Sequence, residues 1–582
     1  MTKELTQFGA VGEDGSHGDA VDRLKPFVQH ATGEGDVVPA GERTSVDGED
    51  AGFMTPQPPP DPLGLALKCY ENSTEYLDSS LRSQWERNER AFQSQHPSGS
   101  KYLSAAYKHR SALFRPKTRA AIRQGEAQAA ASYFSNEDIV SLGASNPGDK
   151  KNQAAADLMK EVLQNRLTSG SPRTGVPWFT TVIGAYQEAQ KLGAVCSKQW
   201  WEYRYREHRE ATGVDEQGRP TFRTVRTIIR DRPRATLYPL ENVRIDRSAE
   251  WQDPVNSSPF LILMQPMYIH EAQERMRLED PFDPSRKQWL TVDTSILKSA
   301  AGRHKWDAQR AARAPGRDDP HDSDISVDEY TVIWAHENFM WWDNQDWVYW
   351  TAGVRALLSE PRPIEEVYPY VRSGERPVVM GSFLVEPHKT YSSGKPQLTQ
   401  NLQTEANDIA NLRLDNVKLA LNKRFLVRRG RQVDLRSLTR SVPGSITFVT
   451  DIEGDVREME TRDVTSSSFQ EQNLLNVDFD EIAGVFSPGT VQTNRRMNET
   501  VGGMQLLSGS SNLISELDLR TFTETWAEPV IRQLVAMERF FENDAAILAI
   551  AGEKAQLFQK YGIDRIDDDL LEQEKLVRIN VG

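Results

Sequence analysis

The chain has 582 residues, which allows three or four domain-sized units, and only 38% of them are apolar. Its formal net charge of −14 argues against a protein that wraps nucleic acid tightly, because such proteins place Lys and Arg against phosphates. Two distant cysteines, Cys69 and Cys196, provide neither a disulfide framework nor a metal cluster, and they favour a reducing compartment.

The first residues contain no signal-like apolar segment, and no apolar run approaches the length of a membrane span. We therefore expect neither secretion nor a membrane partner. Residues 1–62 are rich in Gly, Asp, Glu and Pro, and their few apolar side chains cannot offset the conformational entropy lost on folding. This composition predicts a flexible N-terminal arm.

Helical spacing of apolar residues begins at Leu63 and continues to Phe92. Three further helices are predicted, over Lys117–Tyr133, Asn152–Leu167 and Thr180–Lys191. Stretches containing Gly, Ser and Pro bound the later ones and support their ends.

The pattern then changes to the two-residue period of strands. Val195–Tyr205 and Phe222–Arg230 predict a β-hairpin with a long loop. A strand over Phe260–Met264 precedes a predicted helix over Tyr268–Leu278. Residues 301–324 are charged and rich in Ala and Pro, which predicts exposed helix ends and a linker.

A second hairpin is predicted over Tyr330–Ala352, with its turn at Asp343–Asp346, followed by a strand over Val378–Leu384. The aromatic load of this hairpin suits a twisted, half-buried sheet, and it also allows a sugar-binding platform. Its aromatic residues are Trp334, Phe339, Trp341, Trp342, Trp347, Tyr349 and Trp350.

A thin apolar stripe runs along a predicted helix over Gln397–Leu421, whose other residues are mostly Gln, Asn, Asp and Thr. Such a helix offers little to the core of one subunit. Two interpretations are open: an ordinary surface helix, or a helix of a barrel shared between subunits. The stripe consists of Leu398, Leu402, Ile409, Leu412 and Leu419.

A basic segment with strand character follows over Phe425–Val449, with a turn at Val442–Ser445 and a short strand at Ile446–Val449. Asp434 is the one acid within its Lys/Arg cluster. Clusters of this kind form a solvated loop or contact nucleic acid or an acidic protein. The candidate docking residues are Arg428, Arg429, Arg431, Arg436 and Arg440.

A second helix is predicted over Ser467–Phe486, with Leu475, Phe479, Ile482 and Phe486 on one face. Its other faces contain the acids Asp478, Asp480 and Glu481. If the helix lines a pore, these acids keep DNA from binding the wall, because like charges repel. The alternative is an ordinary amphipathic helix over a core.

The loop at 487–494 lacks the pattern of a phosphate-binding loop, because no Lys follows its glycine. Its uncharged polar side chains can form and break weak hydrogen bonds at little cost. Two arginines at its far end can reach phosphates or a neighbouring subunit. The candidate loop residues are Ser487, Thr490, Gln492, Thr493, Asn494, Arg495 and Arg496.

Toward the C-terminus, a long amphipathic helix is predicted over Glu516–Glu542. Pro529 within it predicts either a kink or the first turn of a second helix. The remaining residues, from Ala545 to Gly582, predict an acidic helical tail.

The succession from Pro387 to Glu516, a helix, a basic insertion, a second helix and a polar loop, resembles the stem, clip, stem and tunnel loop of tailed-phage portal proteins, most closely those of short-tailed phages. Two upstream segments agree: Leu237–Asp246 with Asp253-Pro254 resembles the connection between portal wing sheets, and 377–394 resembles the lead-in to the stem. The resemblance covers most of residues 63–545.

The resemblance implies an α+β, ring-forming portal-type fold, mainly α with wing β-hairpins. The implied domains lie in this order: an N-terminal arm at 1–62, a wing at 63–395, a first stem helix at 396–421, an α/β clip at 422–465, a second stem helix at 466–486, a tunnel loop and following helix at 487–515, and C-terminal wing or crown helices at 516–582.

The resemblance also implies partners: a homo-oligomer, usually of twelve subunits with heterologous interfaces, and double-stranded DNA passing through without sequence specificity. The clip is expected to dock the terminase large subunit during packaging and adaptor or tail proteins afterwards. Capsid and scaffolding proteins are further expected partners. The implied location is the portal vertex of the virion, after assembly in the host cytoplasm, with no cofactor and no hydrolysis by the protein itself.

Two alternatives remain open from the sequence. One is another virion component, such as a tail adaptor. The other is a glycoside-active enzyme, because carboxylates are plentiful and the Trp-rich hairpin offers a platform. No HExxH, CxxC, GxSxG or Walker A pattern occurs, which argues against the enzyme classes that these motifs mark.

Overall fold

The computed structural model describes residues 56–135, 139–144, 150–168, 171, 173–214, 220–280, 285–300, 330–421, 424–430, 433–440, 446–449, 451–452, 454–459, 465–484, 513–541 and 575–579. All of them belong to one compact unit, 56–582. The predicted arm up to residue 55, the linker at 301–324 and the loop at 487–494 lie outside the described residues. None of the described helices is long and apolar enough to cross a membrane.

The N-terminal helical run divides into two helices, α2 (Pro62–Ser80) and α3 (Arg82–Phe92), which meet at Leu81. Asp61 begins α2 as its N-cap, since its carboxylate accepts a 2.9 Å hydrogen bond from the Gly64 N–H. Short 3-10 turns, η1 (Lys101–Leu103) and η2 (Ala105–Tyr107), follow α3.

The next three predicted helices are confirmed, as α4 (Lys117–Phe134), α5 (Lys150–Thr168) and α6 (Trp178–Leu192). Helix α6 ends at Gly193, which has φ of 93°. Two features require glycine at this position. The backbone is in the left-handed region, and a Cβ atom would lie 1.8 Å from the Ser392 carbonyl oxygen.

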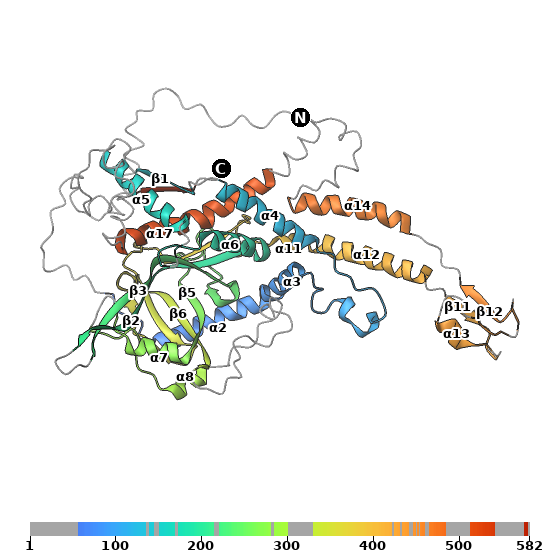
Figure 1. Ribbon diagram of the computed structural model, residues 1–582, viewed down its shortest axis with the longest axis horizontal. Helices are drawn as coiled ribbons and strands as arrows, with labels where there is room; N and C mark the ends of the chain where they lie inside the picture. Colours follow the sequence, from blue (N-terminus) through green and yellow to red (C-terminus); the bar gives the residue numbers. More distant parts are fainter. Residues whose placement is uncertain are drawn as a thin grey trace, which may run out of the picture. The chain divides into compact units, whose positions relative to one another are not determined.

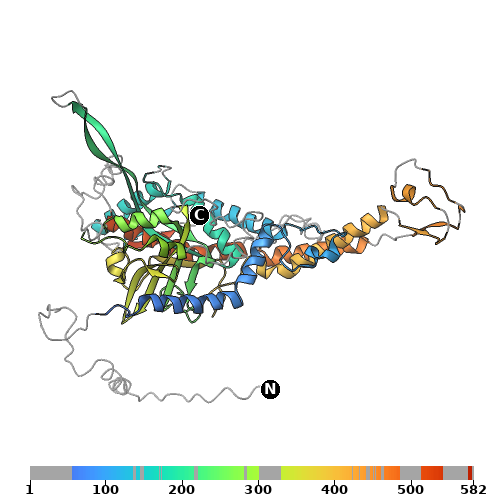
Figure 2. The same cartoon turned by 90° about the horizontal axis from the view of Figure 1, so that it is seen from below.

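The first predicted hairpin is present and is longer than expected. Its strands β2 (Ala194–Val214) and β3 (Pro220–Tyr238) form a three-stranded sheet with β10 (Val378–Ser382) on the outer edge of β2. Strand β10 pairs only with the start of β2, up to Lys198. Beyond that residue the hairpin continues as a two-stranded ribbon (Figure 2).

The second hairpin, β6 (Val332–Trp342) and β7 (Gln345–Ala352), is the centre of a six-stranded antiparallel sheet. Its turn residues Asp343 and Asn344 have φ of 51° and 59°, as the twist of a two-residue hairpin turn requires. The other strands are β4 (Val243–Ile245), β5 (Phe260–Tyr268), β8 (Ala356–Leu357) and β9 (Arg362–Pro363). Along the chain, η3 (Leu240–Asn242) precedes β4, α7 (Ile269–Arg277) and α8 (Thr294–Ala300) lie between β5 and β6, and α10 (Ile364–Val367) follows β9.

Packing explains most of the aromatic load of this hairpin. Trp334, Trp347, Phe339 and Tyr349 are buried in the cores on either side of the sheet, while Trp341 and Trp342 are exposed at its end. Burial of large aromatic side chains supplies much of the hydrophobic stabilisation of such a sheet. The four buried residues are therefore part of the protein interior and are not available for a continuous sugar platform.

The C-terminal helix contains a π-helical turn. It runs through residues 513–522, the π turn Thr523–Ala527 and α17 (Glu528–Phe541). Pro529 is the second residue of α17, so the wider π turn lies just before it, where the proline ring would otherwise clash with the helix backbone. The buried face of this helix and helices α5 and α6 enclose the largest core cluster.

The predicted acidic tail is wrong over its last described residues. Lys575–Ile579 form strand β13, which pairs antiparallel with β1 (Val140–Ala144). A five-residue strand of this kind has no helical periodicity to distinguish it, because its pairing partner lies more than four hundred residues away along the chain. The rest of the tail lies outside the described residues.

The segment that resembles a stem and clip contains α11 (Lys395–Leu398), α12 (Gln400–Leu421), β11 (Arg424–Val427), α13 (Leu435–Arg440), β12 (Val456–Met459) and α14 (Thr465–Ile482). Helices α12 and α14 lie side by side, with the β11–β12 segment beyond their ends (Figure 1). The strand predicted at 446–449 is not present; β11 pairs with β12 instead, and a short helix occupies 435–440.

Candidate functional site

The pair of helices α12 and α14 is joined through a small core. Phe479 of α14 and Ala483, which follows the end of α14, pack with Ala121 of α4, and Leu402 of α12 lies against them. Across the pair, the Arg413 guanidinium stacks on the Phe469 ring at 4.2 Å. So little buried apolar surface in one subunit leaves most of both helices available for other contacts.

The buried face of α12 is polar, which corrects the prediction of an apolar stripe. Gln403, Asn407 and Asn411 are buried with the small residues Ala406 and Ala410. Leu398 and Leu412 of the predicted stripe are exposed instead. Hydropathy favours leucine for the inner face, and the structure reverses the assignment because an extended backbone lies against this helix.

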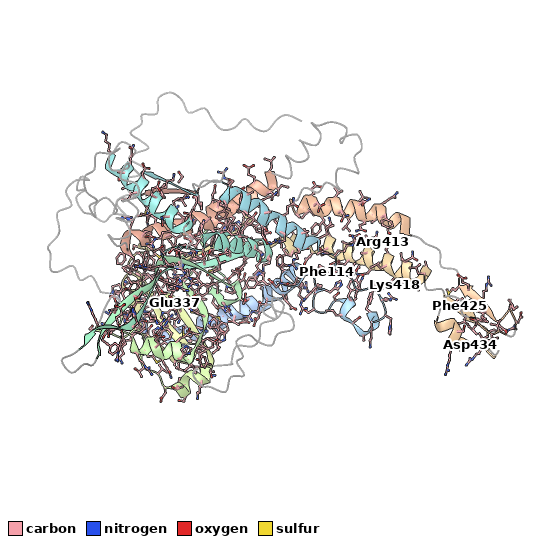
Figure 3. All side chains as sticks on the ribbon, in the orientation of Figure 1. Phe114, Glu337, Arg413, Lys418, Phe425 and Asp434 are labelled. Carbon is pink, nitrogen blue, oxygen red and sulfur yellow. The ribbon has the colours of Figure 1, made fainter. Side chains whose placement is uncertain are left out.

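That backbone is residues 111–116, here called the strap, which runs along α12 (Figure 3). The Arg115 N–H donates to Asn407 Oδ1 at 2.8 Å, and the Leu113 N–H donates to Asn411 Oδ1 at 2.7 Å. The Ser111 N–H donates to Asp415 Oδ1 at 2.8 Å.

The residue spacings of helix α12 and of the extended strap explain why their hydrogen bonds match. Four helical residues rise about 6 Å, and two extended residues advance about 6.6 Å. Side chains four apart on the helix therefore meet alternate amides of the strap. Gln403 completes the series, because its amide nitrogen donates to the Arg115 carbonyl oxygen at 2.7 Å.

The outer faces of the helix pair expose large apolar side chains among polar ones. Leu412 is 61% exposed and Leu421 is 77% exposed on α12, and α14 exposes Phe469, Leu474 and Ile482. The sequence predicts Ile482 on one face with Leu475 and Phe479; those two are buried, whereas Ile482 is exposed. Water contact with large apolar side chains costs about 25 cal/mol per Å² relative to burial, so covering these faces would be favourable.

The three predicted stem acids separate into two environments. Asp478 and Glu481 are exposed, whereas Asp480 is only 7% exposed and its carboxylate lies 3.3 Å from the Lys117 ammonium. The interpretation of Asp480 as a channel-facing acid is therefore corrected, since Asp480 ties α14 to α4. The exposed pair retains the predicted acidic face.

A buried lysine fixes the base of the helix pair. Lys395 donates to the Ala483 carbonyl oxygen at 3.3 Å and lies 3.1 Å from the Asp518 carboxylate. Burial raises the pKa of Asp518, and the Lys395 ammonium partly offsets this effect. The contact joins the start of α11, the end of α14 and the C-terminal helix.

In the clip segment, the short helix α13 is capped at its N-terminus by Asp434. Asp434 Oδ1 accepts hydrogen bonds from the N–H groups of Arg436, at 3.1 Å, and Ser437, at 3.3 Å, which begins α13. The acid that sequence reasoning singled out within the basic cluster thus has a structural role. Figure 3 marks its position beyond α12.

The predicted docking arginines are exposed where the structure describes them. Arg428, Arg429 and Arg436 are exposed on the clip segment. The backbone of Arg440 ends α13, and Arg431 lies outside the described residues. Sequence reasoning missed a set of exposed apolar clip residues that accompany them: Leu426, Leu435, Ile446, Phe448 and Ile452.

The predicted loop residues Ser487, Thr490, Gln492, Thr493, Asn494, Arg495 and Arg496 lie outside the described residues. Among the residues that the structure does describe, no group of three or more His, Cys, Asp or Glu side chains is arranged to hold a metal ion.

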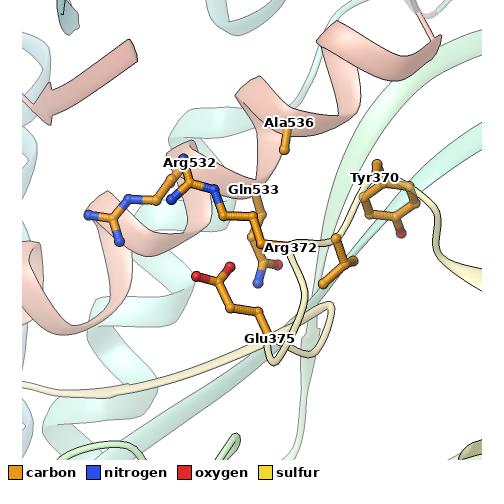
Figure 4. A pocket seen from close by; sticks show the side chains of 7 residues that line it. Tyr370, Arg372, Glu375, Arg532, Gln533 and Ala536 are labelled. Atoms are coloured by element: carbon orange, nitrogen blue, oxygen red, sulfur yellow. The ribbon is translucent and has the colours of Figure 1, made fainter. Parts of the chain in front are cut away.

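An open hollow lies between the 370–375 segment and α17 (Figure 4). Its empty volume of about 250 Å³ includes open solvent. Sites for drug-sized ligands enclose about 300–1,000 Å³. Its arginines, Arg372 and Arg532, are exposed. The hollow thus lacks the enclosure of a ligand site.

Comparison with known families decides between the interpretations that the sequence left open. The family model of the phage SU10 portal protein matches residues 207–560, more than half of the chain. The chain belongs to the phage SU10 portal protein family. No curated protein sequence matches it.

Membership confirms the prediction of a phage portal protein. Portals are structural proteins of the virion, located in the capsid, and the family implies oligomeric assembly and the passage of DNA. The matched range of this portal family member includes the outer part of the β2–β3 hairpin, helices α12 and α14 and the segment between them.

Proposed function

We propose that the chain is the subunit of a closed portal ring at one capsid vertex, through which DNA enters during packaging and leaves during ejection. One observation carries the proposal. Two adjacent helices, α12 and α14, flank the segment that contains β11, α13 and β12, and both helices expose large apolar side chains, among them leucine, isoleucine and phenylalanine.

The exposed apolar faces support assembly of identical subunits. A heterologous interface joins one surface of a subunit to a different surface of the next, and it closes into a ring when the rotation between copies divides a full turn. Side chains such as Leu412 and Leu421 would be covered by the neighbouring copy. The family resemblance favours twelve copies.

The remaining acids support a channel wall that DNA does not bind. Asp478 and Glu481 are exposed on α14 and add negative charge to it. Repulsion between carboxylates and phosphates, screened by mobile counterions, keeps the duplex moving. We assign residues 487–496, which lie outside the described residues, to the tunnel loop of this channel.

The clip supports docking of other particle proteins. Its exposed arginines, Arg428, Arg429 and Arg436, offer charge-assisted contacts, and its exposed apolar residues offer area to bury. We assign this surface to the terminase large subunit during packaging and to adaptor or tail proteins after it. Assembly in the host cytoplasm, with capsid and scaffolding proteins, belongs to the same proposal.

Imaging of the purified full chain tests the proposal. At micromolar concentration we expect closed rings in negative-stain images and a matching particle mass by mass photometry. A population of monomers at this concentration, without rings, would contradict it. Joining of the protein only to finished heads, and not to assembling ones, would instead identify a tail adaptor.

A further inference from the structure

The β2–β3 ribbon is exposed on both faces beyond its sheet. Residues 203–210 of β2 are all exposed, and most of residues 222–230 of β3 are exposed as well. Figure 2 shows the ribbon extending from the rest of the wing. Neither stem, clip nor tunnel loop accounts for this element.

The strand register divides the ribbon into two faces of different charge. Side chains of paired residues point to the same side, and successive residues alternate. Arg204 pairs with Arg230, and Tyr205 with Ile228. The basic face therefore contains Arg204, Arg206, Arg223, Arg230, Arg232 and Arg234, against the acids Glu202 and Glu210; the opposite face contains Tyr203, Tyr205, Glu207, Arg209, Arg226 and Asp231.

The opposite face is electrically balanced. The Arg226 guanidinium lies 2.8 Å from the Glu207 carboxylate and stacks 4.9 Å from the centre of the Tyr205 ring. At its base, Asp231 accepts a 2.9 Å hydrogen bond from Trp201, whose ring stacks on Phe541 of α17. This side of the ribbon faces the wing core at its base.

The basic face has an excess of positive charge. Glu202 is shared by Arg230, Arg232 and Arg234, at 2.6, 3.1 and 3.3 Å. Burial alone would raise the pKa of Glu202, and these guanidinium groups lower it below its ordinary value. One carboxylate therefore serves three arginines.

Further out, the same face continues with three arginines, Arg204, Arg206 and Arg223. No carboxylate in the described part of the chain forms an ion pair with them. In a chain of net charge −14, this segregation of positive charge on one side of a projecting ribbon is a specific feature.

We propose that the basic face of the β2–β3 ribbon binds the phosphate backbone of double-stranded DNA outside the channel, without sequence specificity. The arginines from position 223 to position 234 span about 36 Å of extended chain, and each DNA strand presents one phosphate per about 3.4 Å of axis. Arginine suits this contact because its planar guanidinium binds phosphate oxygens in pairs.

An extended row of charge favours DNA over a compact acidic protein. A polyanion with regular spacing can meet the exposed arginines of the row together, whereas a folded protein surface mixes acids with bases. Arg232 is the exception within the row, because its side chain is only 12% exposed and also donates to the Gly175 carbonyl oxygen. Two-stranded ribbons are also narrow enough to lie along a groove of the duplex. The proposal is independent of the channel contacts described above.

Closed circular DNA tests the site, because a covalently closed circle cannot thread through the channel of a preformed ring. The full chain is titrated onto a duplex minicircle at 50–200 mM salt, and retention is measured by gel shift. The double variant R204E/R206E is compared with R209E/R226E, which makes the same charge change on the opposite face. The variant R428E/R429E reports any contribution of the clip.

For R204E/R206E we expect at least a tenfold loss of affinity. The slope of log K against log salt should fall by about 1.8, since each lost phosphate contact contributes about 0.9. R209E/R226E and R428E/R429E should stay within about threefold of the parent chain. The neutral variant R204Q/R206Q, which also checks that folding is intact, should lie between R204E/R206E and the parent.

Three outcomes would overturn the assignment: no binding of circles by the parent chain at 50 mM salt, equal losses in the two ribbon variants, or failure of R204E/R206E alone to form rings. The last would make the basic face a contact between copies of the chain. Rings that form normally and bind no circles would refute the DNA site while the proposed function stands.

Discussion

The Asn411 side chain pairs with both backbone groups of Leu113. Its Oδ1 accepts from the Leu113 N–H at 2.7 Å, and its Nδ2 donates to the Leu113 carbonyl oxygen at 2.8 Å. The Asn411 amide thus forms the same pair of hydrogen bonds with Leu113 that a residue of a neighbouring strand forms in a sheet. The strap depends on helix α12 for its backbone hydrogen bonds.

Replacing Asn411 with leucine should release the strap. Both backbone groups of Leu113 lose their partner, and since these two hydrogen bonds are only part-buried, each loss should cost about 0.5–1.5 kcal/mol, the net value of a typical hydrogen bond. Hydrogen exchange should show faster exchange of the Leu113 amide, and the unfolding midpoint in urea should fall. Glu405→Gln, on the exposed side of the same helix, should change neither measurement. An unchanged Leu113 exchange rate in N411L would contradict the account.

Gly381→Ala should destabilise the wing. A Cβ at Gly381 would lie 2.5 Å from Trp526 Cβ and 2.9 Å from its backbone nitrogen, in the π turn of the C-terminal helix. Overpacking of this kind costs about 1–3 kcal/mol, measured as a lower urea midpoint. Gly184→Ala is the matched control, since its new Cβ meets only Leu237 Cδ1 at 3.4 Å within helix α6. That variant should be neutral or slightly more stable.

Stability should fall with rising pH through the titration of Glu538. Burial raises the pKa of this carboxyl to about 7, although Arg166 lies 3.0 Å away and lowers it. The folded chain then holds a proton that the unfolded chain releases above its ordinary pKa of 4.5. The stabilisation is complete below about pH 4.5 and is lost as pH rises through about 7, by up to about 1.4 kcal/mol per pH unit.

The variant E538Q isolates this effect. Glutamine cannot titrate, so the difference in unfolding free energy between parent and variant should vary across pH 4.5–7, whereas other titrating groups cancel in the difference. A difference independent of pH in that window would show that Glu538 stays charged in the fold.

Charges on the outer face of α12 should prevent assembly without unfolding the subunit. L412D/L421D places carboxylates where the neighbouring copy is proposed to pack, and burying them would cost far more than the lost leucine contacts. Mass photometry should show a shift from rings to small species, while the urea midpoint of the dissociated subunit changes little. N401D/T404D, at exposed polar positions of the same helix, should still assemble.

Reversal of the clip arginines should separate docking from assembly. In R428E/R429E/R436E we expect rings to form and DNA packaging to be lost, because charge-assisted contacts to the motor become repulsive. R277E/K287E/K68E makes the same charge change at exposed positions elsewhere and should package normally. Normal packaging by the clip variant would remove these arginines from the docking surface.

Local signals in the sequence were sufficient for most elements. The helices α4, α5 and α6 and both hairpins follow from apolar period and from turn residues such as Asp343 and Asn344, which act within a few positions of one another. The predictions failed where a distant segment decided. Strand β13 forms because it pairs with the distant strand β1. In the clip segment, β11 pairs with β12, whereas the sequence predicts a strand at 446–449 that the structure does not contain.

The sequence by itself determined the order of elements, the presence of the two hairpins and the concentration of arginine in the clip segment. These features depend on neighbours along the chain. Only the tertiary structure decided which faces are buried. It placed Asn407 and Asn411 inward against the strap and Leu412 outward, and it paired Asp480 with Lys117. Hydropathy alone cannot give this result, since the hydrogen bonds that make a polar face the inner one come from backbone almost three hundred residues earlier.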